Sequence, residues 1–441
     1  YGGLDNRYDD DRNSIDTMDG GLGDDTYVLG SQIYHSPWYD NSSQVVIQDA
    51  GGVDTVISRS GSWVLGPGLE NLELYNSYGE GGTNGVGNEL NNILHVHSSW
   101  WVSGNLDGGD GNDTLLGGDG RDHFTFAAGS GNYGNDYVDG GGDEDTLDFT
   151  GARSGVTIDF RAGTATGGGT GGSGSVTFVN VDAAIGSAFN DLIIAPDTIV
   201  QHRYGEQWGP TLSGGDGNDT LRGGAQRDAL LGGSGDDEIH GGGGNDQITG
   251  GQGNDRLFGD DGNDQFILTT EYVNGQPAGN GNDTIDGGAG IDSINYLGAW
   301  SGIVADFRAG TITGGDADGG GSISFSGIEN LTGTYYADRI VGDAADNVLA
   351  GGGAGEDTIF GGAGNDTLEG LAGNDILNGG YGSDSVVGGD GNDTLYGGLD
   401  NRYDDDRNSI DTMDGGLGDD TYVLGSQIYH SPWYDNSSQV V

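Results

Sequence analysis

The sequence predicts an all-β protein, a parallel β-roll or β-helix solenoid in which short strands stack coil upon coil. Residues 214–267 form six consecutive nonapeptides in unbroken register, from GGDGNDTLR to GDDGNDQFI. Each nonapeptide begins with glycine, carries Asp at its sixth position and has an apolar residue at its eighth. A repeat this short cannot bury its apolar residue alone, so neighbouring repeats must stack to build a core.

The nine positions divide into a turn and a strand. A Gly-Gly-x-Gly turn can take φ > 0, which allows its backbone carbonyls to curl inward. The last three residues form a short strand whose apolar member points into a thin core. The predicted core residues are Leu221, Leu230, Ile239, Ile248, Leu257 and Phe266.

The sixth-position Asp residues lie beside this turn. If two nonapeptides make one coil, alternate nonapeptides stack. Stacking would place Asp219, Asp237 and Asp255 along one edge, and Asp228, Asp246 and Asp264 along the other. Calcium is a hard cation that takes six to eight oxygen ligands, and it accepts backbone carbonyls as readily as carboxylates. We therefore expect Ca²⁺ in the glycine-rich turns.

The nonapeptide at 223–231 departs from the pattern. Its fourth residue is Gln226 rather than glycine, and Arg227 places a positive charge beside the expected ion. A side chain at a turn position that needs φ > 0 costs about 1–2 kcal/mol. We expect a weakened calcium site at Asp228.

The composition points to a chain that needs cations in order to compact. It has 70 acidic against 14 basic residues and a net charge of −56. Low hydrophobicity with high net charge is typical of chains that stay disordered by themselves. Such acidity argues against binding to nucleic acid or an anionic membrane. The chain has no Cys for a disulfide framework, no apolar run near the ~18 residues of a membrane span, and no recognisable signal peptide.

The nonapeptides resemble the hemolysin-type calcium-binding repeats of RTX proteins. The resemblance implies parallel β-rolls with calcium between stacked turns, and a bacterial protein that leaves the cell by type I secretion. The candidate calcium ligands are the sixth-position residues of the nonapeptides along the whole chain. They are Asp25, Asp113, Asp122, Asp145, Asp219, Asp228, Asp237, Asp246, Asp255, Asp264, Asp283, Asp292, Asp357, Asp366, Asp375, Asp384, Asp393 and Asp420.

The resemblance also divides the chain into segments. Degenerate RTX coils with polar and aromatic loops occupy 1–103, and the VLGPGLENLEL and GNELNNILH stretches within 64–94 match an interstitial segment of large RTX proteins. We expect irregular coils there that bind little calcium. Three RTX β-rolls are predicted at 104–149, 213–295 and 351–396, two β-rich spacers at 150–212 and 296–350, and the start of a further copy at 397–441.

Two internal duplications support this division. Residues 1–46 and 396–441 are identical, at an offset of 395 residues. We interpret the chain as a window of a longer tandem array and expect an uncapped solenoid that continues past both ends. The second duplication pairs SGVTIDFRAGTATGG at 154–168 with SGIVADFRAGTITGG at 301–315, an offset of 147 residues, and these stretches belong to the two spacers.

Histidine and aromatic clusters interrupt the repeats. In HVHSSWW at 95–101, His95 and His97 alternate as on one face of a strand. Two interpretations remain open: a metal-binding pair, or a surface strand that makes lateral contacts. Aromatic loops at 34–39, 100–101 and 204–208 are candidate contact surfaces. Covering an open flank of the roll, or binding sugar, are the alternatives for these loops.

Motifs for catalysis are missing from the sequence. It contains no HExxH, no GxSxG and no Cys, which argues against a zinc protease, a lipase and a thiol nucleophile. We therefore expect a structural protein rather than an enzyme: an extracellular calcium-stabilised filament or stalk whose partners are copies of itself, with possible lateral or cell-surface contacts. The alternatives are the extender of a giant adhesin and the secretion or folding module of an exoenzyme.

Folding is predicted to require calcium. Extracellular calcium modules have Kd values of roughly 10⁻⁴–10⁻³ M, and at ten times Kd each site adds about 1.4 kcal/mol. A dozen sites would supply on the order of 15 kcal/mol, as much as the whole stability of a typical domain. Circular dichroism should show β structure with calcium and its loss in EDTA at neutral pH. Persistent β structure in EDTA at that pH would contradict the prediction.

Overall fold

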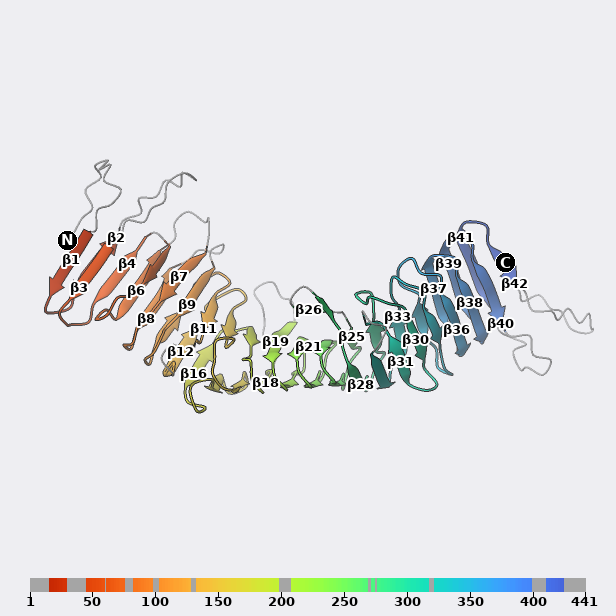
Figure 1. Cartoon of the computed structure of the whole chain (residues 1–441), viewed down its shortest axis with the longest axis horizontal. Helices are drawn as coiled ribbons and strands as arrows, with labels where there is room; N and C mark the ends of the chain where they lie inside the picture. Colours follow the sequence, from red (N-terminus) through yellow and green to blue (C-terminus); the bar gives the residue numbers. More distant parts are fainter. Residues whose placement is uncertain are drawn as a thin grey trace, which may run out of the picture. The chain divides into compact units, whose positions relative to one another are not determined.

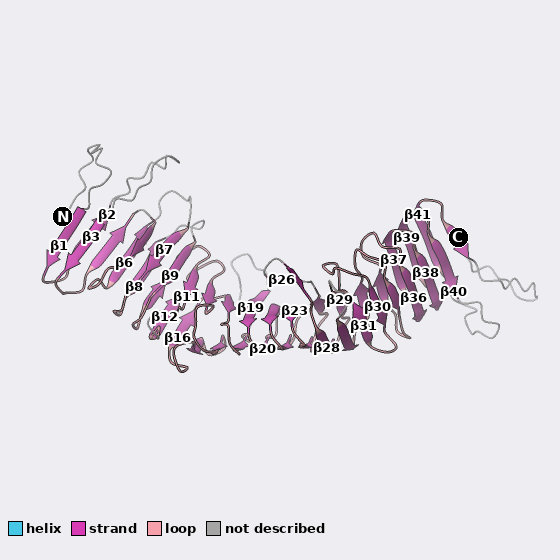
Figure 2. Cartoon of the chain, viewed as in Figure 1, coloured by secondary structure: helices cyan, strands magenta, loops and turns pink. Residues whose placement is uncertain are grey.

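The structure is a computed structural model that describes residues 16–29, 45–59, 61–75, 82–97, 103–127, 132–197, 208–268, 271–273, 276–316, 321–398 and 410–423. Every regular element in these ranges is a β-strand (Figure 2). The described residues include no helix long and apolar enough to cross a membrane. The loops at 34–39, 100–101 and 204–207 lie outside the described residues, as does the side chain of Trp208.

The chain forms two compact units, Tyr1–Thr220 and Leu221–Val441, called here the N-terminal and C-terminal units. Within each, consecutive strands alternate between two sheets, and strands of one sheet stack side by side (Figure 1). This arrangement is the predicted parallel β-roll solenoid. The strand β20 (Thr220–Arg222) lies at the boundary.

In the N-terminal unit, β1 (Asp16–Gly21) pairs in parallel with β3 (Val45–Asp49). The first sheet runs β2 (Thr26–Leu29), β4 (Thr55–Ser58), β6 (Asn71–Tyr75), β8 (Ile93–His97), β10 (Thr114–Leu116), β12 (Asn135–Asp139), β16 (Ser175–Val179), β15 (Thr164–Gly167), β14 (Val156–Asp159), β18 (Leu192–Ile194). The second runs β5 (Ser62–Val64), β7 (Thr83–Val86), β9 (Gly104–Asp107), β11 (His123–Thr125), β13 (Thr146–Asp148), β17 (Ala183–Ile185), β19 (Trp208–Asp216).

The C-terminal unit repeats this plan. Its first sheet runs β22 (Glu238–His240), β24 (Arg256–Phe258), β28 (Asn282–Asp286), β32 (Ser322–Ser326), β31 (Thr311–Gly314), β30 (Ile303–Asp306), β34 (Arg339–Val341), β36 (Thr358–Ala363), β38 (Ile376–Tyr381), β40 (Thr394–Gly398), β42 (Thr421–Val423). Its second runs β21 (Arg227–Ser234), β23 (Gln247–Gln252), β25 (Gln265–Ile267), β29 (Ser293–Asn295), β33 (Asn330–Thr332), β35 (Val348–Ala350), β37 (Thr367–Ala372), β39 (Ser385–Asp390), β41 (Thr412–Leu417). A separate hairpin joins β26 (Glu271–Val273) to β27 (Gln276–Ala278).

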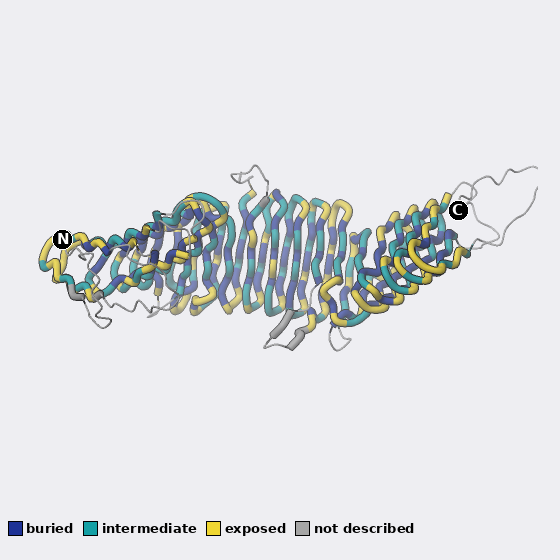
Figure 3. Tube along the Cα trace, turned by 90° about the horizontal axis from the view of Figure 1, so that it is seen from above, coloured by how far each residue is buried: buried dark blue, intermediate teal, exposed yellow. Residues whose placement is uncertain are grey.

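Two nonapeptides make one coil, as the sequence predicts. In the C-terminal unit Glu238 pairs with Arg256 and Ala229 with Gln247, each 18 residues apart. The eighth-position residues Leu230, Ile239, Ile248, Leu257 and Phe266 are at most 2% exposed. In Figure 3 the buried residues run through the stacked strands, and many of the exposed residues lie at the turns. The core is therefore one apolar side chain per strand, repeated along the stack.

The two spacers depart from purely parallel pairing. In the first, β15 pairs antiparallel with both β14 and β16, and in the second β31 pairs antiparallel with β30 and β32. The outer strands of each trio pair in parallel with the neighbouring coils. Each spacer is thus built into a sheet. The packing is also duplicated, because the T-shaped ring pairs Phe160–Phe178 and Phe307–Phe325 have centroids 5.2 and 5.1 Å apart.

The interstitial segment at 64–94 is more regular than the sequence suggests. Its strands pair in register, β6 with β4 and β8, and β7 with β5 and β9. The coils still differ in length, because Asn71 pairs with Thr55, 16 residues before it, and with Ile93, 22 residues after it. Leu72, Leu74 and Leu94 are fully buried and continue the core. The apolar alternation continues through these coils even though the glycine turn is missing.

Removal of a core side chain should destabilise the roll. Leu257 is fully buried, and the change Leu257→Ala leaves a cavity that costs roughly 2–5 kcal/mol. Leu231→Ala is the control, because Leu231 is 37% exposed and surface substitutions usually stay within about 0.5 kcal/mol. Urea unfolding at a fixed calcium concentration measures both. Equal losses in the two variants would contradict the assignment of the core.

Candidate calcium sites

A ladder of aspartates runs along each edge of the roll. The backbone N–H of one ladder Asp donates to Oδ1 of the equivalent Asp in the next coil. In the C-terminal unit Asp228 donates to Asp246 and Asp246 to Asp264, both at 2.8 Å, while Asp237 donates to Asp255 at 2.9 Å. We call these rows the carboxylate ladders. They match the two predicted edges over the residues of this unit.

Both compact units contain carboxylate ladders. In the N-terminal unit the donor–acceptor pairs include Asp25–Asp54, Asp113–Asp136, Asp122–Asp145 and Asp191–Asp219. In the C-terminal unit they include Asp255–Asp283, Asp264–Asp292, Asp338–Asp357, Asp357–Asp375, Asp366–Asp384, Asp375–Asp393 and Asp393–Asp420. Together with the three pairs above, every predicted ligand residue lies on a ladder.

Sequence reasoning missed several members of the ladders. Asp136, Asp191 and Asp338 accept ladder bonds from Asp113, Val156 and Ile303, respectively. The same sequence pattern could have identified each of them, because GNYGND, GSAFND and GTYYAD all carry glycine at the first position and Asp at the sixth. Asp54 has no such signal, since it follows a shortened Gly-Gly turn.

One oxygen of most ladder carboxylates is buried without a hydrogen-bond partner. These orphaned atoms are Oδ2 of Asp54, Asp113, Asp145, Asp246, Asp255, Asp264, Asp292, Asp357, Asp366, Asp375 and Asp393. The residues are at most 2% exposed, so water does not solvate these oxygens. A buried charged oxygen without a partner raises the free energy of the folded state strongly, and a bound cation usually compensates for it.

First-position glycines create the space that faces these oxygens. A Cβ on Gly241 would lie 2.5 Å from Asp246 Oδ2 and 2.6 Å from the carbonyl oxygen of Gly259 in the next coil. The same convergence occurs at Gly232, where Asp237 Oδ2 and the Gly250 carbonyl oxygen would lie 2.3 and 2.4 Å away. Only glycine therefore leaves this oxygen-lined space open.

The second and fourth glycines shape the turn. Gly251 and Gly253 have φ values of +103° and +138°, which side chains rarely adopt. A Cβ on Gly253 would also approach the carbonyl oxygen of Gly235 to 1.9 Å. Steric crowding therefore favours glycine at these positions, while Asp143, Asp260 and Leu371 hold a positive φ at such positions in other turns.

Burial raises the pKa of the ladder carboxyls. Desolvation, together with neighbouring carboxylates, raises the pKa of Asp246 and Asp283 to about 8 and that of Asp145 to about 9. Hydrogen bonds from backbone N–H groups offset only part of this effect. Near neutral pH these carboxyls therefore need either a proton or a cation.

The chemistry of the donor set fits calcium. The turns offer carboxylate and carbonyl oxygens and no nitrogen or sulfur donor, which is the set that a hard cation prefers. Calcium would neutralise the orphaned Oδ2 atoms and hold stacked turns together. The ladder Asp residues and the glycine carbonyls beside them would be its ligands.

Asp228, in the nonapeptide where the sequence predicts a weak site, differs from other ladder residues in which of its two carboxylate oxygens is buried without a partner. Its Oδ2 accepts a hydrogen bond from the Gly224 N–H at 2.6 Å, and Oδ1 is the buried atom without a partner. Positive φ among the described non-glycine residues occurs at Asp143, Asn180, Asp260 and Leu371. Gln226 therefore avoids the strained conformation.

Asparagine replaces aspartate at some positions of the carboxylate ladders. Asn92 Nδ2 donates to the carbonyl oxygens of Leu69 and Glu70 at 3.1 and 3.2 Å, and Asn347 Nδ2 donates to that of Glu329 at 3.0 Å. An amide satisfies these carbonyls and adds no charge. Calcium has less to bind there, which supports the expectation for the 64–94 segment.

Comparison with known proteins identifies the family. The RTX calcium-binding nonapeptide repeat family matches residues 13–33, 104–132, 129–151, 211–239, 231–266, 278–295, 323–354, 351–386, 369–403 and 408–428. These matches cover more than half of the chain, so the protein belongs to this family of calcium-binding repeats. A search of curated proteins finds no match. Calcium is accordingly the cofactor of these repeats.

Loss of one ladder carboxylate should weaken calcium binding. Asp264→Asn removes a buried charged oxygen, and the loss of one site at ten times Kd removes about 1.4 kcal/mol. Asp261→Asn is the matched control, because Asp261 is exposed in the same nonapeptide and loses the same charge. Calcium titration followed by circular dichroism should give a higher midpoint for Asp264→Asn than for Asp261→Asn. Equal midpoints would contradict the ligand assignment.

Acid should substitute in part for calcium. The ladder pKa values are raised in the folded chain, for example to about 7 at Asp113 and about 8 at Asp246, above the ordinary 3.8. The stability linked to their protonation is therefore complete below pH ~4 and lost as the pH rises through about 6 to 9. In EDTA, β structure should increase on acidification from pH 8 to 4. Calcium affinity should fall over the same range, and a pH-independent affinity would contradict this.

Proposed function

We propose that the chain is a segment of an extracellular calcium-stabilised filament or stalk, built from tandem copies of a 395-residue repeat. The proposal rests on the hydrogen bonds and strand pairing of the segment that the chain contains twice. Asp25 and Asp420 are the same residue in the two copies, 395 positions apart. The two copies show opposite halves of one ladder junction.

The first half is seen in the N-terminal unit. There the backbone N–H of Asp25 donates to Asp54 Oδ1 at 2.8 Å, and its carbonyl oxygen accepts from the Thr55 N–H at 2.9 Å. Both bonds point to the following coil.

The second half is seen in the C-terminal unit. Asp420 Oδ1 accepts from the Asp393 N–H at 3.0 Å, and the Thr421 N–H donates to the Asp393 carbonyl oxygen at 2.7 Å. Both bonds point to the preceding coil. The two sets use different atoms or edges of the same segment, so one copy can make both at once.

The strands support the same conclusion. Thr26 in β2 pairs with Thr55 of the following coil, while the equivalent Thr421 in β42 pairs with Thr394 of the preceding coil. A parallel strand with a neighbour on each side is an ordinary interior strand. A copy that begins where another ends therefore continues both the sheet and the carboxylate ladder.

The calcium requirement favours an extracellular location. RTX repeats are typical of type I-secreted bacterial proteins. A chain with a net charge of −56 stays extended without neutralising cations. Such a chain would pass a secretion channel unfolded and fold in a medium rich in calcium. The absence of Cys is compatible with metal ions acting as the cross-links in place of disulfides.

Electron microscopy of the native material tests this function. At about 18 residues per coil and ~4.8 Å between strands, 395 residues rise on the order of 100 Å. Because loops and spacers use residues without rise, the axial repeat should be near or below that length. Uniform fibres that dissolve in EDTA would support the filament.

Other images would favour the alternatives. Short stalks that end in a globular head would favour the extender of an adhesin. A single particle with a separate globular domain beside one roll would favour the folding module of an exoenzyme and would overturn the tandem proposal. A tandem of two copies provides a second test, because its length by small-angle X-ray scattering should rise by about one axial repeat.

A further inference from the structure

A cluster of nitrogen and oxygen donors lies on the outer face of the first sheet in the N-terminal unit. Glu73 of β6 pairs in register with His95 of β8, and Tyr75 pairs with His97. Leu94 and Val96 point into the core, so the alternating His95 and His97 point outward. The three side chains of Glu73, His95 and His97 are about one third exposed, at 28, 32 and 31%.

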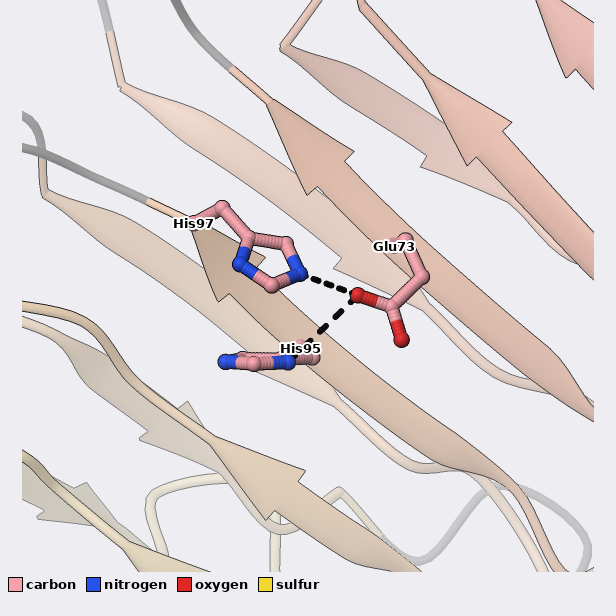
Figure 4. A group of neighbouring side chains, drawn as sticks. All are labelled: Glu73, His95 and His97. Carbon is pink, nitrogen blue, oxygen red and sulfur yellow. Dashed lines mark hydrogen bonds and ion pairs between the residues drawn. The ribbon is translucent and has the colours of Figure 1, made fainter.

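The donor atoms of this cluster converge. His95 Nδ1 lies 3.4 Å from Glu73 Oε2, and His97 Nε2 forms a hydrogen bond to the same oxygen. Figure 4 shows both rings turned toward the carboxylate. All three ligand atoms lie within 4.8 Å of one another. Ligands 2.0–2.1 Å from a tetrahedral ion lie about 3.3 Å apart, so small side-chain movements would centre an ion among them.

Neighbouring groups hold the rings in place. The Tyr75 ring stacks on His97 with centroids 4.2 Å apart and planes 9° apart. The two imidazole centroids are 3.8 Å apart. The site is therefore largely preformed on rigid sheet.

This donor set differs in kind from the carboxylate ladders. Two imidazoles with one carboxylate suit zinc, copper or nickel rather than calcium, which prefers oxygen. His123 contacts Asp148, and His240 contacts Glu238 and Asp260, but each supplies a single imidazole. Among the described residues, the cluster at Glu73 is the group of three or more candidate ligands that contains histidine.

We propose that Glu73, His95 and His97 bind one divalent transition-metal ion such as Zn²⁺ on the outer face of the roll. Three protein ligands leave a position open for water or for a ligand from outside. The metal would replace the hydrogen bond between His97 and Glu73. This site uses none of the carboxylate-ladder residues and does not depend on the tandem arrangement.

Isothermal titration of the full, untagged chain with zinc chloride in saturating calcium tests the proposal. Saturating calcium fills the oxygen sites, so zinc reports on the histidine cluster. We expect one zinc ion per chain. His97→Gln and Glu73→Gln should each weaken its affinity at least tenfold, since even partners outside the ligand shell cost 10- to 100-fold.

His240→Gln is the matched control, because His240 is a surface histidine of equal exposure at 32%. It should leave zinc affinity unchanged. Circular dichroism with calcium confirms that each variant folds. Cobalt absorption gives an independent readout, because loss of its visible bands in His95→Gln but not in His240→Gln supports direct ligation. Zinc affinity that is the same in His97→Gln and in the unmodified chain overturns the proposal.

Discussion

The structure depends on the burial of carboxylate oxygens between stacked turns. A ladder Asp such as Asp246 donates its backbone N–H to the next coil and accepts a hydrogen bond from the preceding coil through Oδ1. In most ladder residues Oδ2 stays in a dry, glycine-lined space. Without a cation this arrangement is electrostatically unfavourable, as the raised pKa values of Asp145 and Asp246 show. With calcium, the same oxygens become the attachment between coils. A core of one or two apolar side chains per strand is thin, and bound ions would provide the remaining stability.

Much of this could be read from the sequence. The period of nine specifies a turn and a strand, and the order of glycine, Asp and apolar residue specifies which atoms face inward. The 18-residue coil and the two edges of Asp followed from this order and match the pairing of Ala229 with Gln247. The positions of Leu257 and Phe266 in the core followed in the same way.

Other features were outside the reach of the pattern. The antiparallel β15 depends on where a chain without the repeat folds back, which local alternation does not specify. The conformation of Gln226 depends on whether its turn can avoid a positive φ. The sequence pattern predicted only the energetic cost of a side chain at positive φ. Glu73 joined the site of His95 and His97 through the register of β6 and β8, which the sequence did not reveal.

The ladder bonds all point the same way along the chain. An N–H always donates to the carboxylate of the following coil, as Asp375 does to Asp393. Any stack of such coils therefore has one face of unfilled acceptors and one of unfilled donors. Two faces of the same kind cannot satisfy one another, so growth by joining identical ends is forbidden. A fibre of this protein would be polar, with two different ends. Every junction along it would be heterologous, joining two unlike surfaces.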